Sequence, residues 1–263
     1  MTKPPLEFRI AVITGASAGI GRAIAEHLVS LGARVVINAR RADRLEAFAS
    51  SVGHSRAISV AGDAAEPEIL RRMLDAARDG HGGGVREADL VVVNAGRGLG
   101  GSVITSDTAA WAELLRTNIT AAALLIREAG KRMLKAAEGR SGPVLVDAPR
   151  DIIVIGSTVG RHVSPFSSMY GATKVAVHGM TEGVRRELGP KGVRVSLVEP
   201  GFVESEFQGV AGYDPAWFNE VKGRIGPVLQ PADVARTVGF IAQQPPSVHV
   251  ADVLIRPTRQ DYP

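Results

Sequence analysis

The sequence predicts a doubly wound α/β fold, in which helices cover both faces of a mostly parallel, seven-stranded sheet. Two observations support this prediction. Short apolar runs alternate with helical patterns along the chain, and several of the runs are rich in Val and Ile at successive positions. Strands that are covered on both faces have such continuous apolar runs. The 263 residues fit one domain of this kind, so we expect a single domain over residues 1–263.

The expected strands are the short apolar runs, and the expected helices are the longer segments with apolar residues three or four positions apart. The strands are expected at Phe8–Ile13, Val35–Ile37, Ala57–Val60, Leu90–Val93, Ile152–Ile155, Val193–Val198 and Asp252–Ile255. The helices are expected at Gly21–Leu31, Arg44–Ser51, Glu68–Arg78, Ala109–Ala137, Ser168–Leu188 and Ala232–Gln243.

Three segments are longer than this alternation requires. His81–Glu87 is a Gly-rich loop, and Gly139–Asp151 is a long connection; both are interpreted as surface insertions. Gly201–Gly226 mixes Gly, Pro and large aromatic residues after the sixth expected strand. Because ligands bind at the carboxyl ends of such strands, we interpret this third segment, about residues 201–226, as a lid over a substrate.

The composition excludes several kinds of site. The chain contains no cysteine, which rules out a disulfide scaffold, a thiolate nucleophile and a metal held by cysteine. The six histidines are scattered without ligand spacing, so no catalytic metal is expected. The start of the chain resembles no signal peptide, and no apolar stretch approaches the roughly 18 residues that span a bilayer. A cytoplasmic protein without a membrane partner is therefore expected.

The net charge of +4 and the sequence pI of about 9.7 raise the question of nucleic-acid binding. The Lys and Arg residues are scattered, and only 5% of the residues are aromatic, which leaves little for base stacking. We therefore expect no nucleic-acid partner.

A glycine-rich turn follows the first expected strand directly. Thr14–Gly21 has the spacing Gly-x-x-x-Gly-x-Gly and leads into the first helix. Glycines at such a turn let the backbone approach a pyrophosphate, which then sits at the helix N-terminus. A plain strand-to-helix turn would have similar glycines, but the position in an alternating fold favours a dinucleotide site.

A second motif, Tyr170-x-x-x-Lys174, lies in an expected helix, where positions i and i+4 share a face. A nearby ammonium favours the phenolate form of a tyrosine and so makes it a better acid/base group. Ser157 follows the fifth expected strand and could bind a substrate oxygen, although a turn or capping serine would look the same. Tyr-x-x-x-Lys also occurs by chance, as a buried Tyr beside a surface Lys.

Together these motifs resemble the short-chain dehydrogenase/reductase family, in its short single-domain branch with a Rossmann-like sheet. The resemblance extends from Ile10 to Ile255, and its motifs occur in the family's order. The matching positions are Thr14–Gly21, Asn94-Ala95-Gly96, Asn118, Ser157, Tyr170, Lys174 and Pro200-Gly201.

The resemblance implies a role for each matching residue. Tyr170 would be the acid/base, Lys174 would hold the nicotinamide ribose and lower the tyrosine pKa, and Ser157 would bind the reacting oxygen. Asn118 would hold a water in a proton relay. The implied cofactor contacts are Gly15, Ser17, Gly19, Ile20, Gly21, Arg40, Asp63, Asn94, Ala95, Gly96, Tyr170, Lys174, Pro200, Gly201, Val203 and Ser205.

The end of the second strand predicts NADP(H) rather than NAD(H). An Asp or Glu about 20 residues after the glycine turn would bind the ribose 2′-hydroxyl of NAD. Ala39 stands at that position, and Arg40 follows it with a guanidinium suited to a 2′-phosphate. Arg41 could add charge, and Asp43 is close enough to pair with Arg40. Alternatively, both arginines are simply solvated.

The expected function is therefore hydride transfer between NADP(H), with NAD(H) as the alternative cofactor, and a small ketone, aldehyde, hydroxy acid or polyol, with a tyrosine as general acid/base. Two alternatives stay open: a non-catalytic dinucleotide-binding redox sensor, and an epimerase or dehydratase that uses the same Tyr and Lys. The resemblance also implies a homo-oligomer, most commonly a tetramer.

Overall fold

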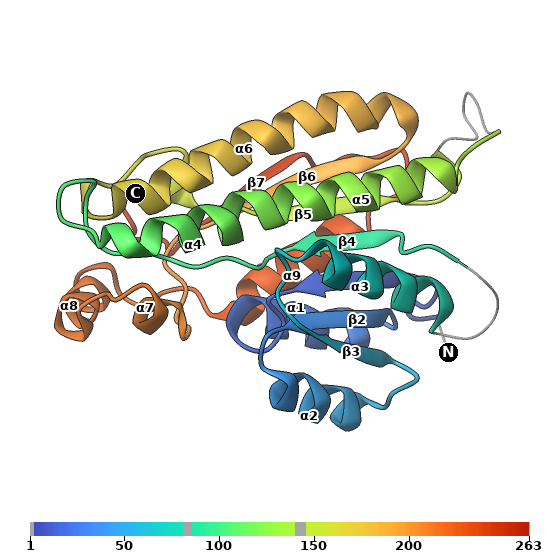
Figure 1. Cartoon of the computed structure of the whole chain (residues 1–263), viewed down its shortest axis with the longest axis horizontal. Coiled ribbons are helices and arrows are strands. Elements are labelled where there is room, and N and C mark those ends of the chain that lie inside the picture. Colours follow the sequence, from blue (N-terminus) through green and yellow to red (C-terminus); the bar gives the residue numbers. More distant parts are fainter. Residues whose placement is uncertain (1–2, 81–85, 140–145, 263) are drawn as a thin grey trace.

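The computed structural model describes residues 3–80, 86–139 and 146–262 and has a seven-stranded, all-parallel sheet at its centre (Figure 1). The strand order is β3-β2-β1-β4-β5-β6-β7, which confirms the predicted fold class. The chain crosses over between β3 and β4, so the carboxyl ends of β1 and β4 border the switch point where ligands bind in such sheets. The strands are β1 (Ile10–Thr14), β2 (Arg34–Ala39), β3 (Ala57–Ala61), β4 (Leu90–Val93), β5 (Asp151–Ile155), β6 (Arg194–Pro200) and β7 (Asp252–Ile255).

Most of the helices form a layer on one or the other face of the sheet (Figure 1). The helices of the described residues are α1 (Gly19–Ser30), α2 (Ala42–Val52), α3 (Pro67–Asp79), α4 (Trp111–Leu115), α5 (Ala121–Lys135), α6 (Ser168–Leu188), α7 (Phe207–Val210), α8 (Pro215–Ile225) and α9 (Pro231–Ala242). Successive strand residues point to opposite faces. Val12 packs among residues of α3, α5 and α6, whereas its neighbour Ile13 packs among residues of α1, α2 and α9. Both faces are thus buried, as the continuous apolar runs predict.

The long central helix differs from the expectation. The sequence pattern predicts one helix over Ala109–Ala137, but the structure has a short 3-10 turn, then α4, a π turn at Arg116–Thr120, and α5. Apolar periodicity does not detect a π turn, because the turn inserts one residue without changing the buried face much. This π turn contains Asn118.

The expected lid, Gly201–Gly226, contains α7 and α8, which lie apart from the two helical layers, on the left of Figure 1. The lid begins directly after β6, and an isolated bridge between Val203 and Leu229 joins its first residues to the segment that follows it. Asp214 caps α8 by accepting a hydrogen bond from the backbone of Ala216. The lid is therefore structured and fixed at its root.

An ion-pair network joins the amino ends of four strands. Arg9 binds Asp89 and Asp151 at 2.7 Å each, and Arg194 binds Asp151 at 2.6 Å. Asp151 is fully buried, and both arginine side chains are 7% exposed. Because these residues precede or begin β1, β4, β5 and β6, the network holds the sheet together at the edge opposite to the strands' carboxyl ends.

Two of the expected insertions lie partly outside the described residues: positions 81–85 of His81–Glu87 and positions 140–145 of Gly139–Asp151. Within the described ranges, no helix is long and apolar enough to cross a membrane. The same ranges contain no group of three His, Asp or Glu side chains that could hold a metal ion.

Candidate active site

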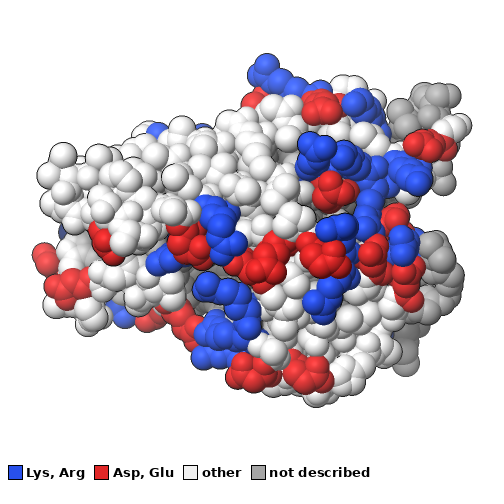
Figure 2. Space-filling model, in the orientation of Figure 1, with Lys and Arg blue, Asp and Glu red and all other residues white. Residues whose placement is uncertain are grey.

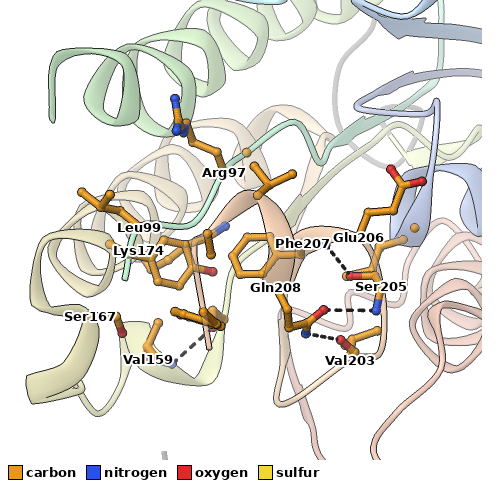
Figure 3. A pocket seen from close by; sticks show the side chains of 18 of the residues that line it. Arg97, Leu99, Val159, Ser167, Lys174, Val203, Ser205, Glu206, Phe207 and Gln208 are labelled. Carbon is orange, nitrogen blue, oxygen red and sulfur yellow. Dashed lines mark hydrogen bonds between the residues drawn. The ribbon is translucent and has the colours of Figure 1, made fainter. Parts of the chain in front are cut away.

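A cleft of about 1170 Å³ lies at the carboxyl ends of the strands. Its floor comes from the loops after β1, β4, β5 and β6, and the lid forms one wall (Figure 3). It contains every residue of the expected site except Asn118, whose neighbour Thr117 lines it.

The glycine turn after β1 leaves room for a ligand at the N-terminus of α1. Gly15 and Gly19 have φ of +68° and +54°, which other residues rarely adopt. A Cβ on Gly21 would lie 2.4 Å from the carbonyl oxygen of Gly15. No side chain caps the helix at Ala18, so the backbone N–H groups of the first turn remain available to an anion. The turn thus fits the pyrophosphate of a dinucleotide.

Asn94, the residue after β4, fixes the start of this turn by hydrogen bonds to Thr14. Its Nδ2 donates a hydrogen bond to the carbonyl oxygen of Thr14 at 2.9 Å, and its backbone N–H donates to Thr14 Oγ1 at 3.1 Å. Ala95 also donates to Thr14 Oγ1, at 3.0 Å. The Asn-Ala-Gly motif therefore holds the backbone of Thr14, at the start of the glycine turn, in position.

Tyr170 and Lys174 lie one turn apart on α6 and are both buried. The Lys174 ammonium is 5.9 Å from the centroid of the Tyr170 ring and donates a hydrogen bond to the carbonyl oxygen of Ile155 at 2.9 Å. Ser157, two residues after β5, hydrogen-bonds the Tyr170 hydroxyl. The helix and the strand end therefore bring the three predicted side chains together.

Burial acts on the proton affinities of this pair in opposite directions, because it disfavours the charged form of each group. Burial raises the pKa of Tyr170 above its ordinary value, and the hydrogen bond from Ser157 opposes this only in part. Burial lowers the pKa of Lys174 to about 8. The lowered tyrosine pKa that the resemblance implies is thus not what this arrangement gives. Tyr170 is a neutral phenol, with a proton to donate.

Asn118 connects the loop after β4 to α6. Its Oδ1 accepts a hydrogen bond from the backbone N–H of Arg97 at 2.8 Å. Its Nδ2 donates to the carbonyl oxygen of Arg97 at 2.9 Å and to Thr173 Oγ1 at 3.0 Å. Both amide hydrogens are used within the protein. The side chain therefore fixes the loop over Gly96, and Gly96 lies between Asn118 and Lys174.

His178 supports the site, although no motif or spacing in the sequence indicates this role. A Cβ on Gly156 or Gly160 would lie 2.4 or 2.3 Å from the His178 ring, so the turn that carries Ser157 is folded around that ring. His178 Nε2 accepts a hydrogen bond from the Ser157 backbone at 3.3 Å. Behind it, the fully buried Glu199 accepts two hydrogen bonds of 2.6 Å from Arg161. Burial lowers the pKa of His178, which favours the neutral ring that can accept this bond.

The end of the cleft beside Ala39 at the end of β2, where the resemblance places the adenosine of the cofactor, is here called the adenosine end. Its arginines, Arg40 and Arg41, are arranged differently from the expectation. Arg40 is 74% exposed and lies 3.7 Å from Glu113, not beside Asp43. Arg41 donates a hydrogen bond to Ser17 Oγ in the glycine turn at 3.1 Å. Arg41 therefore faces the cleft more directly than Arg40.

Asp63 lines the cleft as expected, but its carboxylate is already engaged. It pairs with Arg116 and accepts a hydrogen bond from the backbone of Ala65 at 2.9 Å. Burial alone would raise the pKa of Asp63, but these hydrogen bonds and the charge of Arg116 lower it. This side chain is thus held in place beside the adenosine end.

The remaining expected contacts follow β6, where the C-terminal tail supports them. Gly201 lies against the tail, because a Cβ there would be 2.2 Å from Gln260 Oε1. The same oxygen accepts a hydrogen bond from the Phe202 backbone at 3.0 Å. Pro200, Val203 and Ser205 also line the cleft.

A row of aromatic rings extends from Tyr170 into the lid. Phe207 lies 5.5 Å from Tyr170, ring centroid to ring centroid, and Tyr213 lies 6.4 Å from Phe207. Trp217 continues the row, 5.5 Å from Tyr213. In Figure 3 the Phe207 ring points toward the side of the cleft that contains Lys174. The lid thus gives the cleft an apolar wall beside the tyrosine hydroxyl.

A family model described as short chain dehydrogenase matches residues 9–214. The chain belongs to the short-chain dehydrogenase/reductase family. It is therefore an oxidoreductase of the family's NAD(P)-binding kind.

The relatives cover nearly the whole chain. An uncharacterised oxidoreductase of Staphylococcus saprophyticus is 31% identical over 255 residues, which are 96% of this chain and 98% of the relative. Dehydrogenase/reductase SDR family member 11 of Mus musculus is 34% identical over 265 residues, covering 96% and 95%. Among solved structures, the closed form of a serine dehydrogenase complexed with NADP+ is 25% identical, with a TM-score of 0.83 and 96% of both chains covered.

Proposed function

We propose that this protein is an NADP(H)-dependent dehydrogenase/reductase that interconverts a small carbonyl compound and its alcohol. The observation that supports this most is the convergence of Ser157, Tyr170 and Lys174 at one point of the cleft, beside a glycine turn that fits a dinucleotide. Asn118 fixes the loop on the opposite side of that point.

In the proposed mechanism, the hydroxyls of Ser157 and Tyr170 hold the substrate oxygen. A bound nicotinamide cofactor supplies or accepts the hydride. During reduction, Tyr170 donates its phenolic proton to the substrate oxygen as negative charge develops there; during oxidation it takes the proton back. Lys174, whose ammonium donates a hydrogen bond to the carbonyl of Ile155, stabilises the phenolate that is left and would hold the ribose hydroxyls of a bound cofactor. Its pKa of about 8 keeps it largely charged at neutral pH.

The apolar wall favours substrates that have an apolar substituent beside the reacting oxygen. Phe207 and Tyr213 face the same space as the Tyr170 ring, with Leu99 and Val159 alongside. A ketone, aldehyde, hydroxy acid or polyol can present its reacting oxygen to Ser157 and Tyr170, and an apolar substituent fits toward the lid. Oxidation of NADPH with a panel of such carbonyl compounds tests the proposal. Turnover with one or more of them is expected, whereas a redox sensor would bind NADPH and turn over none.

The arginines support a preference for NADP(H) over NAD(H). β2 ends at Ala39, where an NAD-selecting carboxylate would stand, and Arg41 donates a hydrogen bond to Ser17 at the adenosine end of the cleft. Arg40 lines the same end and is highly exposed. Guanidinium groups bind a 2′-phosphate with strong, charge-assisted hydrogen bonds.

We expect wild type to have a higher kcat/KM with NADPH than with NADH. The double variant Ala39→Asp/Arg40→Ser should shift that ratio toward NADH, because it adds a carboxylate for the ribose 2′-hydroxyl and removes a cation. Arg41→Ser should lower the kcat/KM for NADPH more than Arg40→Ser does. Arg127→Ser, an exposed arginine on α5, serves as the control and should leave the ratio unchanged. A wild type that prefers NADH would contradict the assignment.

We also propose a homo-oligomer, a tetramer by resemblance to the family. Long helices α5 and α6 lie side by side in one outer layer (Figure 1). Leu115 of α4 and Val175 of α6 are exposed large apolar side chains. Light scattering should give about four times the mass of 27.6 kDa. A monomer at working concentration would contradict this.

The visible face of the molecule does not favour a nucleic-acid partner. Basic and acidic side chains are interleaved there without an extended patch of one sign (Figure 2). A small-molecule substrate remains the proposed partner.

A further inference from the structure

The lid is tied to the adenosine end of the cleft through one carboxylate. Glu206, the residue before α7, binds Arg41 at 2.7 Å and Arg44 at 2.6 Å, with one carboxylate oxygen for each arginine. Both arginines come from the start of α2 or the residue before it. Hydrogen bonds from Arg44 and Arg41 hold the pKa of Glu206 below its ordinary value, so the carboxylate is charged.

The neighbouring residue ties the lid to the catalytic end. Phe207 packs on Tyr170, whereas Glu206 points to the opposite side, toward the N-terminal half of the fold (Figure 3). The segment Ser205–Gln208 is here called the strap. Within it the Phe207 backbone donates a hydrogen bond to Ser205 Oγ, and Gln208 Nε2 ties it to the preceding carbonyl of Val203. Ser205 also lies against Gly19 of the glycine turn. The strap therefore crosses the cleft between its two ends.

Arg41 and Arg44 each donate to one carboxylate oxygen of Glu206, and guanidinium groups can bind the oxygens of a phosphate in the same way. Carboxylates and phosphates are both bound by paired N–H donors of arginine. Arg41 also binds Ser17 of the glycine turn, so the site that Glu206 occupies adjoins the adenosine end of the cleft.

We propose that Glu206 competes with the 2′-phosphate of NADP(H) for Arg41 and Arg44, so that 2′-phosphate binding releases the strap from the adenosine end. The inference rests on the proposed function. Two anions cannot share this arginine pair without mutual repulsion, because a 2′-phosphate carries about two negative charges at neutral pH. The pairs are 42–52% exposed, and ion pairs in such positions exchange readily.

Competition predicts two results that are not expected if the arginines bind the 2′-phosphate without any part played by Glu206. Removing the charge of Glu206 should tighten binding of a 2′-phosphate but not of a nucleotide that lacks it. Binding of a 2′-phosphate should also loosen the strap, while a nucleotide without one should leave the strap held.

The test uses adenosine 2′,5′-bisphosphate and adenosine 5′-monophosphate, measured by titration calorimetry on the full chain. Glu206→Gln should bind the bisphosphate at least about fivefold more tightly than wild type does, with unchanged affinity for the monophosphate. Glu204→Gln is the matched control: Glu204 is two residues away, equally exposed, and pairs with Lys222 instead. It should behave as wild type.

Hydrogen exchange provides the second measurement. In wild type, the amides of the strap should exchange faster with the bisphosphate than with the monophosphate. In Glu206→Gln they should exchange fast in both cases. Equal bisphosphate affinities in all three proteins, or weaker binding by Glu206→Gln, would overturn the competition while leaving the dinucleotide site intact. Failure of all three to bind either nucleotide would overturn the proposed function, and with it this inference.

Discussion

Tyr170→Phe should lower kcat by about 100-fold or more, because a general acid/base contributes a factor of this size. The variant removes only the phenolic hydroxyl. The ring that packs against Phe207 and lies near Lys174 remains, so the affinity for the cofactor should stay close to that of wild type. Steady-state kinetics and a fluorescence titration with NADPH measure the two quantities separately.

Tyr262→Phe is the matched control. Tyr262 also lines the cleft, but its hydroxyl donates a hydrogen bond to the carbonyl of Val163 and does not touch Ser157 or Lys174. Its loss should change kcat only slightly. If Tyr170→Phe retains activity within about tenfold of wild type, Tyr170 is not the general acid/base.

Asp151→Asn should destabilise the protein by about 3–5 kcal/mol, because removing one partner of a buried ion pair leaves an uncompensated charge. Asp151 is fully buried and binds both Arg9 and Arg194, which are almost fully buried themselves. Burial alone would lower the pKa of Arg9, but the carboxylates of Asp89 and Asp151 raise it in the wild-type protein. A guanidinium keeps its charge in proteins, so Arg9 stays charged in the variant. Urea unfolding of wild type and variant measures the difference.

Glu182→Gln is the control for that measurement. Glu182 also accepts from two arginines, Arg185 and Arg186, but its side chain is 42% exposed. Exposed ion pairs contribute only about 0–1 kcal/mol. Equal losses in the two variants would show that burial does not determine the strength of the Asp151 network.

Periodicity and motifs predicted the sheet, and they predicted that Ser157, Tyr170 and Lys174 would lie together, because both predictions depend on local patterns. Continuous Val and Ile runs mark strands covered on both faces, and Tyr170 and Lys174 are one helical turn apart. The position of Ser157 follows from its place just after a strand, since the carboxyl ends of parallel strands meet at one edge.

The features that sequence reasoning missed depend on contacts between distant segments. His178 looks like an ordinary helical residue until the turn with Ser157 folds around its ring. Glu206 and Arg41 are far apart in the chain, and no spacing rule connects them. The same holds for Arg40, which pairs with Glu113 from the central helix rather than with nearby Asp43. The sequence identified the residue types at the adenosine end but not their partners.

Transfer of deuterium from the C4 position of labelled NADPH to a carbonyl substrate tests the proposed function most directly. Mass spectrometry of the alcohol product should detect deuterium on the former carbonyl carbon with wild type and almost none with Tyr170→Phe. With wild type, the amount of NADPH oxidised should equal the amount of alcohol formed. If the protein binds NADPH but transfers no deuterium to any ketone, aldehyde or keto acid tested, or if the label is lost to water, hydride transfer to a carbonyl is not its reaction.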